Sequence, residues 1–257
     1  MRLALLTALT ALALPVAAGA QASHEATSSA SSMIATALSD PARQADAAND
    51  ARRKAADVIA FSEIKPGSRV LDLIPGGGYF SRAFSAVVGP KGYVYAVFPE
   101  AYEKVEPGFA DKLREVAKQP HYGNIEVLLQ PANQLTVPAP VDLVFTSQNY
   151  HDYPDKFMGN VDPAVLNKQV FDALRPGGLF VIVDHAAETG SGMRDTDTLH
   201  RIDPAIVKKQ VEAAGFVFDG ELNVLRNPAD THTKKVFDKS IRGQTDQFIY
   251  RFRKPAA

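Results

Sequence analysis

The apolar residues of this chain fall into short continuous runs, and the stretches between them carry apolar residues at helical spacing. Short apolar runs are typical of strands that are buried on both faces, and helices between them allow parallel crossovers. The pattern therefore predicts βαβ units, with a mostly parallel sheet and helices on both of its faces. We expect strands at residues 69–74, 93–98, 125–129, 141–146 and 179–184, and helices at residues 79–88, 101–118, 162–174 and 203–214.

The two ends of this region differ from the alternating pattern. Residues 41–61 place small and apolar side chains on one helical stripe, so a lead-in helix that covers the sheet is expected. Residues 216–225 and 245–253 have strand patterns without a helix between them, which favours an antiparallel pair at one edge. The full expectation is a seven-stranded α/β sheet with an antiparallel C-terminal edge pair.

Residues 1–22 have the order of a secretory signal peptide. Arg2 is followed by an apolar run over residues 3–14, by Pro15 and by small residues that end at Ala22. A membrane anchor is the alternative, but the run is shorter than the roughly 20 residues that span a bilayer. We expect cleavage after Ala22, export to the periplasm and no stable membrane insertion afterwards.

The remaining chain divides into a tether and one domain. Residues 23–40 are rich in Ser, Ala and Thr, which predicts a flexible segment with little packing value. Residues 41–257 contain no further linker or repeat, and 46% of the whole chain is apolar, which is enough for a substantial core. A single domain over residues 41–257 is expected.

Charge and cysteine content exclude several classes of function. Lys and Arg number 28 against 29 Asp and Glu, and no basic block is interleaved with aromatic residues. Nucleic acid is therefore not an expected partner. The absence of cysteine from the sequence excludes disulfides, thiolate metal sites and a cysteine nucleophile.

The stretch "VLDLIPGGGY", residues 70–79, joins the first predicted strand to a helix through three glycines. In an open parallel sheet this loop lies at the edge where ligands bind. Glycine lets the backbone approach a ligand closely, and the N-terminus of the following helix offers free N–H groups to an anionic group. A glycine-rich turn by itself is equally compatible with a purely structural role.

Four later segments bear on whether the glycine loop binds a ligand: "GPKGYVYAVFPE", "VDLVFTSQNYHDY", "LRPGGLFVIVDH" and "DPAIVKKQVEAAGF". Together with the glycine loop, they resemble the class I S-adenosylmethionine-dependent methyltransferase family in order and spacing, over roughly residues 55–253. More narrowly, the chain resembles an exported bacterial branch with "NYHD" and "HRIDP" segments. The resemblance implies a Rossmann-like fold, S-adenosyl-L-methionine as cofactor and methyl transfer to a small-molecule substrate.

The resemblance also implies cofactor contacts in the glycine loop. Asp72 matches the acid that sits by the amino group of the cofactor's methionine moiety. Gly76 and Gly78 match two of the three usual glycines, and Ile74 stands where the first is expected. Gly77 and Tyr79 complete the expected loop contacts.

Two cofactor positions depart from the family pattern. The acid that usually holds the ribose hydroxyls is replaced by Phe98, with Glu100 two residues on. The acid that usually lies near the adenine is replaced by Pro131, with Gln130 and Asn133 as polar substitutes. A site that has lost such acceptors discriminates less strongly for hydroxyl groups.

The segment after the fourth predicted strand carries the candidate chemistry. His151 is the candidate general base for a hydroxyl acceptor, because its ordinary pKa is near neutrality, and Asp152 is the candidate partner that orients it. Asn149 is expected at the cofactor and Tyr150 at the substrate. The alternative is that these polar side chains only cap the loop.

Three further residues are expected to face the substrate: His185, His200 and Arg226. The "HRID" segment could instead serve as a helix start capped by Asp203, and Arg226 could instead lie in a turn. His151, Asp152, Asp184 and His185 together could form a metal-binding cluster. No dense ligand spacing supports that, so no metal site is predicted.

Three functions remain open from the sequence. The leading hypothesis is a small-molecule methyltransferase. A non-catalytic binding protein on the same fold is the alternative, because Phe98 and Pro131 replace cofactor acids and export leads to a compartment where the cofactor is not expected to be abundant. A metal-assisted hydrolase is the third.

Overall fold

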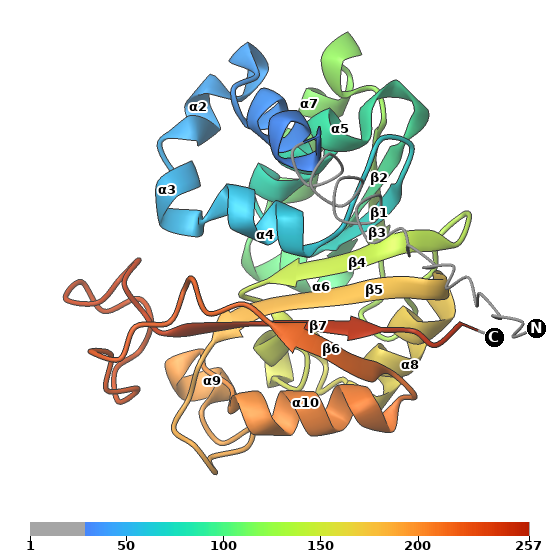
Figure 1. The fold of residues 1–257 in the computed structure, drawn as a ribbon. Coiled ribbons are helices and arrows are strands. Elements are labelled where there is room, and N and C mark those ends of the chain that lie inside the picture. Colours follow the sequence, from blue (N-terminus) through green and yellow to red (C-terminus); the bar gives the residue numbers. More distant parts are fainter. Residues whose placement is uncertain (1–28, 257) are drawn as a thin grey trace, which may run out of the picture.

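A computed structural model describes residues 29–256. Its centre is a seven-stranded sheet with the order β3-β2-β1-β4-β5-β7-β6, and helices cover both faces (Figure 1). Strands β1 to β5 are parallel, and β7 runs antiparallel to both of its neighbours, β5 and β6. The strands are β1 (Arg69–Leu73), β2 (Tyr93–Pro99), β3 (Ile125–Gln130), β4 (Val141–Ser147), β5 (Leu174–His185), β6 (Val217–Glu221) and β7 (Gln247–Arg253).

The alternation of side chains along each strand produces two apolar clusters, one on each face of the sheet. In β4, Leu143 and Phe145 belong to one cluster and Val144 belongs to the other. The first cluster is completed by the helices around α5 (Tyr79–Val88), and the second by α8 (Pro163–Ala173) and α10 (Pro204–Ala213). The expected parallel sheet, buried on both faces, is confirmed.

Two of the expected helices begin as the sequence suggests. Asp162 and Asp203 each accept a hydrogen bond from the backbone N–H two residues on, and a proline follows each of them at the first helical position. Such caps satisfy N–H groups that have no partner inside the helix. The predicted capping role of Asp203 is confirmed.

Two other expected helices are interrupted. The helix expected at residues 101–118 consists of α6 (Glu100–Val105) and α7 (Phe109–Ala117), separated at Gly108, which has a φ of 90°. The lead-in helix expected at residues 41–61 is divided into η1 (Pro41–Arg43), α2 (Gln44–Ala47), α3 (Asp50–Arg53) and α4 (Ala55–Phe61). Lys54 adopts a φ of 52° between the last two. These breaks turn polar side chains of the lead-in segment toward the ends of the strands.

The segment before residue 41 also differs from expectation. Residues 29–38 are helical, and Ile34 and Ala37 are buried in the same apolar cluster as Val58 and Phe84. The ordered region therefore begins N-terminal to the expected boundary, because these apolar residues pack against the core. The expected signal peptide, residues 1–22, lies outside the described residues.

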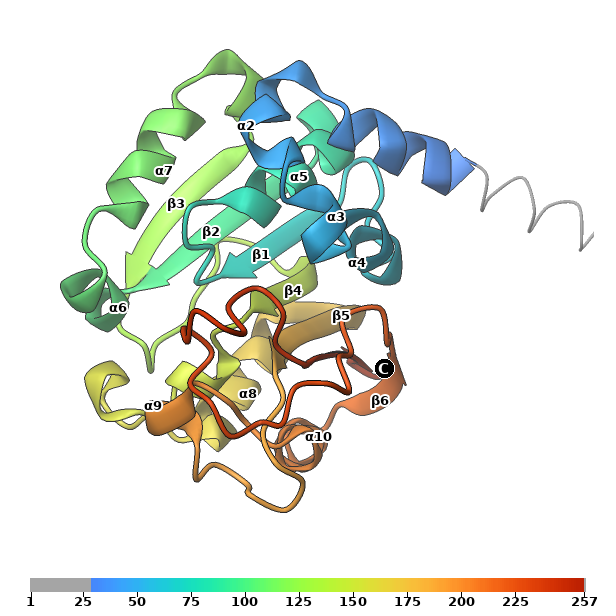
Figure 2. The ribbon, with the colours of Figure 1, turned by 90° about the vertical axis from the view of Figure 1, so that its left-hand side faces the viewer.

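The carboxyl ends of the parallel strands meet at one edge of the sheet. Figure 2 looks onto this edge and shows the irregular chain between β6 and β7, in red, lying across the ends of β4 and β5. In sheets of this kind the crevice at this edge binds ligands. Within residues 29–256, no helix combines the length and the apolar character that crossing a membrane requires.

Candidate active site

A cavity of about 720 Å³ opens at this edge of the sheet. Its walls come from the loop after β1, the segment after β4, the end of β5, and α6 with the residue after it. The chain on either side of the sheet contributes as well, through Asp46 and Arg53 near the N-terminus and Phe237 near the C-terminus. A cavity of this size suits a ligand of cofactor dimensions.

The loop after β1 adopts a left-handed backbone at three positions. Ile74, Gly76 and Gly78 have φ values of 55°, 54° and 77°. Ile74 thus keeps the conformation that a glycine would adopt without strain, although a β-branched residue rarely does so. Its N–H donates to the Val97 carbonyl over 2.9 Å, its carbonyl accepts from Asn149 Nδ2 over 3.1 Å, and its side chain is buried.

Gly78 is required at its position by packing as well. A Cβ on this residue would lie 2.6 Å from Leu113 Cδ1, closer than such atoms approach. Gly76 has open space in the same direction. The loop therefore contains one glycine, Gly78, that packs against α7, and one, Gly76, that only the backbone conformation favours.

Arg82 fixes the glycine loop from α5. It donates to the Gly77 carbonyl over 2.8 Å, and it forms a two-bond ion pair with Asp46 at 2.6 Å for each bond. Paired bonds of this type hold both partners in one orientation. The N-terminal segment and the loop are thereby joined at the wall of the cavity.

Asp72 lies at the end of β1 with 2% of its surface exposed, and it also lines the cavity. Burial raises the pKa of its carboxyl to about 7, although a hydrogen bond of 2.6 Å from Ser81 Oγ and the charge of Arg53 favour ionisation. Desolvation dominates such a shift. A cationic ligand group beside Asp72 would restore its charge at neutral pH.

Aromatic side chains form part of the cavity wall. The Tyr79 hydroxyl donates to Asp50, and the Arg53 guanidinium lies 4.7 Å from the centre of the Tyr79 ring. Burial raises the pKa of Tyr102 to about 12, so this phenol stays neutral. The wall is thus amphipathic, with flat apolar surfaces between a few polar groups.

His151 is held by a buried carboxylate on one side of its ring. Its Nδ1 lies 2.8 Å from Asp184 Oδ1, and its backbone N–H donates to Asp184 Oδ2 over 3.0 Å. The backbone N–H of His185 also donates to Asp184. Burial opposes the ionisation of Asp184, but His151 holds the pKa of this carboxyl below its ordinary value. The carboxylate that orients His151 is therefore Asp184, whereas the sequence had suggested Asp152.

The other ring nitrogen of His151 meets two side chains. Nε2 lies 3.2 Å from Asp152 Oδ1 and 3.2 Å from His200 Nδ1. Burial alone would lower the pKa of His151, but Asp184 and Asp152 outweigh it and raise the pKa to about 9. The two carboxylates therefore favour the protonated form of His151, and its expected role as general base stays a prediction.

His185 lines the same cavity as a neutral group. Its Nδ1 lies 2.9 Å from Thr245 Oγ1, and burial lowers the pKa of its imidazole to about 3. His185, at the end of β5, and His200 both line the cavity, and their expected contact with a substrate stays a prediction.

The comparisons with known proteins agree with this architecture. No family model matches the chain. The protein-L-isoaspartate O-methyltransferase of Ignicoccus hospitalis is 28% identical over 126 residues, 49% of this chain and 51% of that protein. The match therefore spans only about half the length of that relative.

Solved structures resemble a larger part of the chain. A SAM dependent methyltransferase from Aquifex aeolicus has a TM-score of 0.56 at 21% identity, covering 87% of this chain and 98% of that one. Fibrillarin from Aeropyrum pernix, solved with natively bound S-adenosyl-L-methionine, has a TM-score of 0.50 at 18% identity, covering 79% and 76%. The fold is that of the class I methyltransferases.

Besides Gly78, which packs against Leu113, three expected cofactor residues lie outside the cavity wall. Phe98 is fully buried in the apolar core, because β2 continues past it to Pro99. Glu100 opens α6 and is exposed, and Asn133 is exposed with its carbonyl bonded to Gln169. In their place Glu106, just after α6, brings a carboxylate to the cavity.

Two expected substrate residues also lie elsewhere. Tyr150 is buried under the sheet, where its hydroxyl accepts from Asn167 over 2.8 Å and donates to Gln210 over 3.2 Å. Arg226 is paired with Asp246 at 2.9 Å and 3.0 Å, and it lines a second, smaller pocket. Both residues satisfy local polar partners instead of facing the main cavity.

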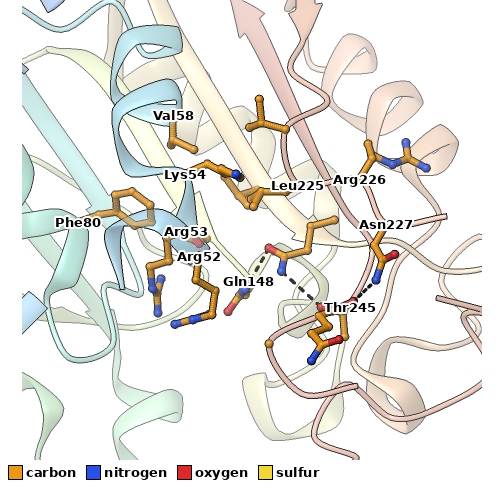
Figure 3. A pocket seen from close by; sticks show the side chains of 16 residues that line it. Arg52, Arg53, Lys54, Val58, Phe80, Gln148, Leu225, Arg226, Asn227 and Thr245 are labelled. Atoms are coloured by element: carbon orange, nitrogen blue, oxygen red, sulfur yellow. Dashed lines mark hydrogen bonds between the residues drawn. The ribbon is translucent and has the colours of Figure 1, made fainter. Parts of the chain in front are cut away.

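A second pocket, of about 260 Å³, shares wall residues with the first, and Figure 3 shows its lining side chains. Arg52, Arg53 and Lys54 come from the lead-in segment on one side, and Arg226 comes from the chain after β6 on the other. Gln148 borders both pockets, as does Arg53. The positive side chains make this pocket suited to an anionic ligand group.

The sequence did not indicate several residues of the cavity wall, which come from the lead-in segment, from α5, from the residue after α6 and from the C-terminal chain. Asp46, Arg53, Arg82, Glu106 and Phe237 all line the main cavity. None of them lies in a motif, and the breaks that turn the lead-in segment toward the cavity were not marked by glycine or proline. Only the tertiary arrangement brings these residues to the ends of the strands.

Proposed function

We propose that the protein is an S-adenosylmethionine-dependent methyltransferase that acts on a small molecule. The main support is the glycine loop after β1, which together with buried Asp72 near the end of β1 lines a cavity of about 720 Å³ in the methyltransferase fold. Bound there, the cofactor would supply an electrophilic methyl group. The chain's own task would be to hold donor and acceptor in line, so proximity would provide much of the rate.

The residues of the cavity fit this cofactor. Asp72 is a buried carboxylate placed to pair with an amino cation, and Gly76 and Gly77 leave the backbone accessible at the wall. Glu106 offers a carboxylate acceptor for hydroxyl groups in place of Phe98. Asn149 lines the same wall while its Nδ2 holds the glycine loop.

The binding of the cofactor is the test. Isothermal titration of the protein with S-adenosylmethionine and S-adenosylhomocysteine is expected to give one site. D72N is expected to weaken binding about 10- to 100-fold, because it removes a charge-assisted hydrogen bond. D111N, at a surface carboxylate on α7 whose side chain is 80% exposed, is the matched control and is expected to bind normally. Failure to bind either ligand at millimolar concentration would overturn the proposal.

We also propose that the chain belongs to an exported bacterial branch of these proteins. The support is the signal-like order of residues 1–22 and the "NYHD" and "HRIDP" segments. His151 and Asp152 of the first segment lie against His200 of the second in the cavity wall. A periplasmic location would require the cofactor to reach that compartment.

A further inference from the structure

Three side-chain atoms in the cavity wall form a nearly equilateral triangle. His151 Nε2 lies 3.2 Å from His200 Nδ1 and 3.2 Å from Asp152 Oδ1, and His200 Nδ1 lies 3.6 Å from Asp152 Oδ1. Two ligands about 2.1 Å from one ion lie roughly 3.0 Å apart at a right angle and roughly 3.4 Å apart at the tetrahedral angle. The triangle thus has the size of a set of ligands that share one cation.

The buried carboxylate of Asp184 aims one of these ligands. Histidine ligands usually give their second ring N–H to a carboxylate or carbonyl, which fixes the tautomer and directs the other nitrogen at the metal. Asp184 is fully buried, accepts two backbone N–H groups and contacts His151 Nδ1. His151 Nε2 is thereby directed into the triangle.

The backbone holds His200 in place from the opposite side. His200 has a φ of 53° and a ψ of 54°, a left-handed conformation that an ordinary residue adopts only when its surroundings impose it. The next residue, Arg201, is fully buried and donates to the Ala186 carbonyl over 2.9 Å and to the Lys234 carbonyl over 3.0 Å. Arg201 also pairs with Asp230 at 2.9 Å. His200 therefore sits on a rigid support.

The charge of Asp152 has only imidazole partners. Over residues 29–256, the basic side chains within ion-pair distance of Asp152 are the imidazoles of His151 and His200. Asp152 is 5% exposed, yet it lines the cavity together with both histidines. A buried carboxylate without an arginine or lysine partner is a suitable ligand for a metal ion.

We propose that His151, Asp152 and His200 bind one divalent transition-metal ion, of the zinc, iron or manganese type, at the wall of the main cavity. Two imidazoles with one carboxylate favour these ions over magnesium and calcium, which prefer oxygen ligands. Three protein ligands leave open coordination positions, as in catalytic metal sites. If the proposed methyl transfer holds, these positions face the same cavity and are available to an oxygen atom of the acceptor.

Titration of untagged, chelator-treated protein with Zn²⁺ and Co²⁺ tests the site. We expect one equivalent of Zn²⁺ to bind with micromolar or tighter affinity, and Co²⁺ to give a visible absorption band. D152N and H200N are expected to weaken binding at least about 100-fold; asparagine at position 200 tolerates the left-handed backbone. D184N, which acts through His151, is expected to weaken it about 10- to 100-fold.

H121N is the matched control. His121 and Asp40 also form a histidine–carboxylate pair, at 2.8 Å, but among residues 29–256 no third metal-ligating side chain completes a cluster with them. Zn²⁺ binding should be unchanged in this variant. The proposal is overturned if no equivalent binds, or if binding persists at full strength in H200N.

The outcome is separable from that of the methyltransferase proposal. Metal binding without cofactor binding supports the metal site and overturns the proposed activity. Cofactor binding without metal binding supports the proposed methyltransferase and overturns the metal site.

Discussion

At the scale of single residues, the cavity is controlled by a few buried charges. Asp72 lines the cavity with 2% of its surface exposed, and the Ser81 hydrogen bond and the charge of Arg53 offset only part of the free energy that burial costs its anion. Burial and the neighbouring Arg52 also lower the pKa of Arg53. Desolvation of both groups makes each of them respond to a charged ligand.

The proposed affinity for the cofactor should therefore depend on pH through Asp72. Its pKa of about 7 leaves the carboxyl mostly protonated at pH 6 and mostly ionised at pH 8. Because only the anion pairs with the amino cation, affinity should rise about tenfold from pH 6 to pH 8. Titration calorimetry at several pH values measures this rise, and D72N should flatten it.

The same shift affects the stability of the free protein. A carboxyl whose pKa is raised in the folded state contributes stability that is complete below its ordinary pKa, near 4, and is lost as the pH rises through about 7. The free energy of unfolding of D72N, relative to that of the unaltered protein, should therefore rise across this window. A constant difference between pH 5 and pH 8 in urea denaturation would contradict the assigned pKa.

At the scale of elements, the course of the glycine loop depends on packing between helices α5 and α7. Gly78 is the N-cap of α5, and a Cβ at this position would clash with Leu113 of α7. Gly76 shares the left-handed backbone but has open space around it. A comparison of substitutions at Gly76 and Gly78 therefore distinguishes the effect of a steric clash from that of the left-handed backbone alone.

G78A is accordingly expected to be more damaging than G76A. Alanine at position 76 meets only the backbone preference, about 1 kcal/mol of unfolding free energy. Alanine at position 78 adds a clash with Leu113, which costs roughly 1–3 kcal/mol more. Urea denaturation of both variants measures the difference, and equal losses would show that the contact with α7 relaxes freely.

At the scale of the whole molecule, the cavity is assembled from both ends of the described chain. The lead-in segment contributes Asp46 and Arg53, and the chain between β6 and β7 contributes Val236 and Phe237. Figure 2 shows that this second segment crosses the edge of the sheet. The loops after the parallel strands line the cavity, and the lead-in segment and the chain between β6 and β7 complete its wall.

Export of the whole molecule is testable directly. We expect the protein in the periplasmic fraction to begin at Ser23, because residues 1–22 would be removed after Ala22. N-terminal sequencing of that fraction gives the result. An intact Met1 in a cytoplasmic protein would contradict the export proposal.

The sequence by itself determined the elements and their class. Alternation along strands and helical periodicity depend on which side chains each face buries, so strands such as β1 and β4 and caps such as Asp203 could be predicted locally. The motif order also indicated the fold and the position of the glycine loop. Ile74 shows the limit of sequence-based prediction. Its side chain suggested a departure from the family's glycine loop, but its backbone adopts the left-handed conformation that a glycine would have there.

Only the tertiary structure decided which polar groups meet. His151 is separated from Asp184 by 33 residues and from His200 by 49, so no local pattern could show that they surround one another. The pKa of Asp72 and the burial of Phe98 likewise depend on packing from distant elements. Side-chain chemistry was readable from the sequence, but distance and desolvation, which decide what that chemistry can do, arise only when the chain has folded.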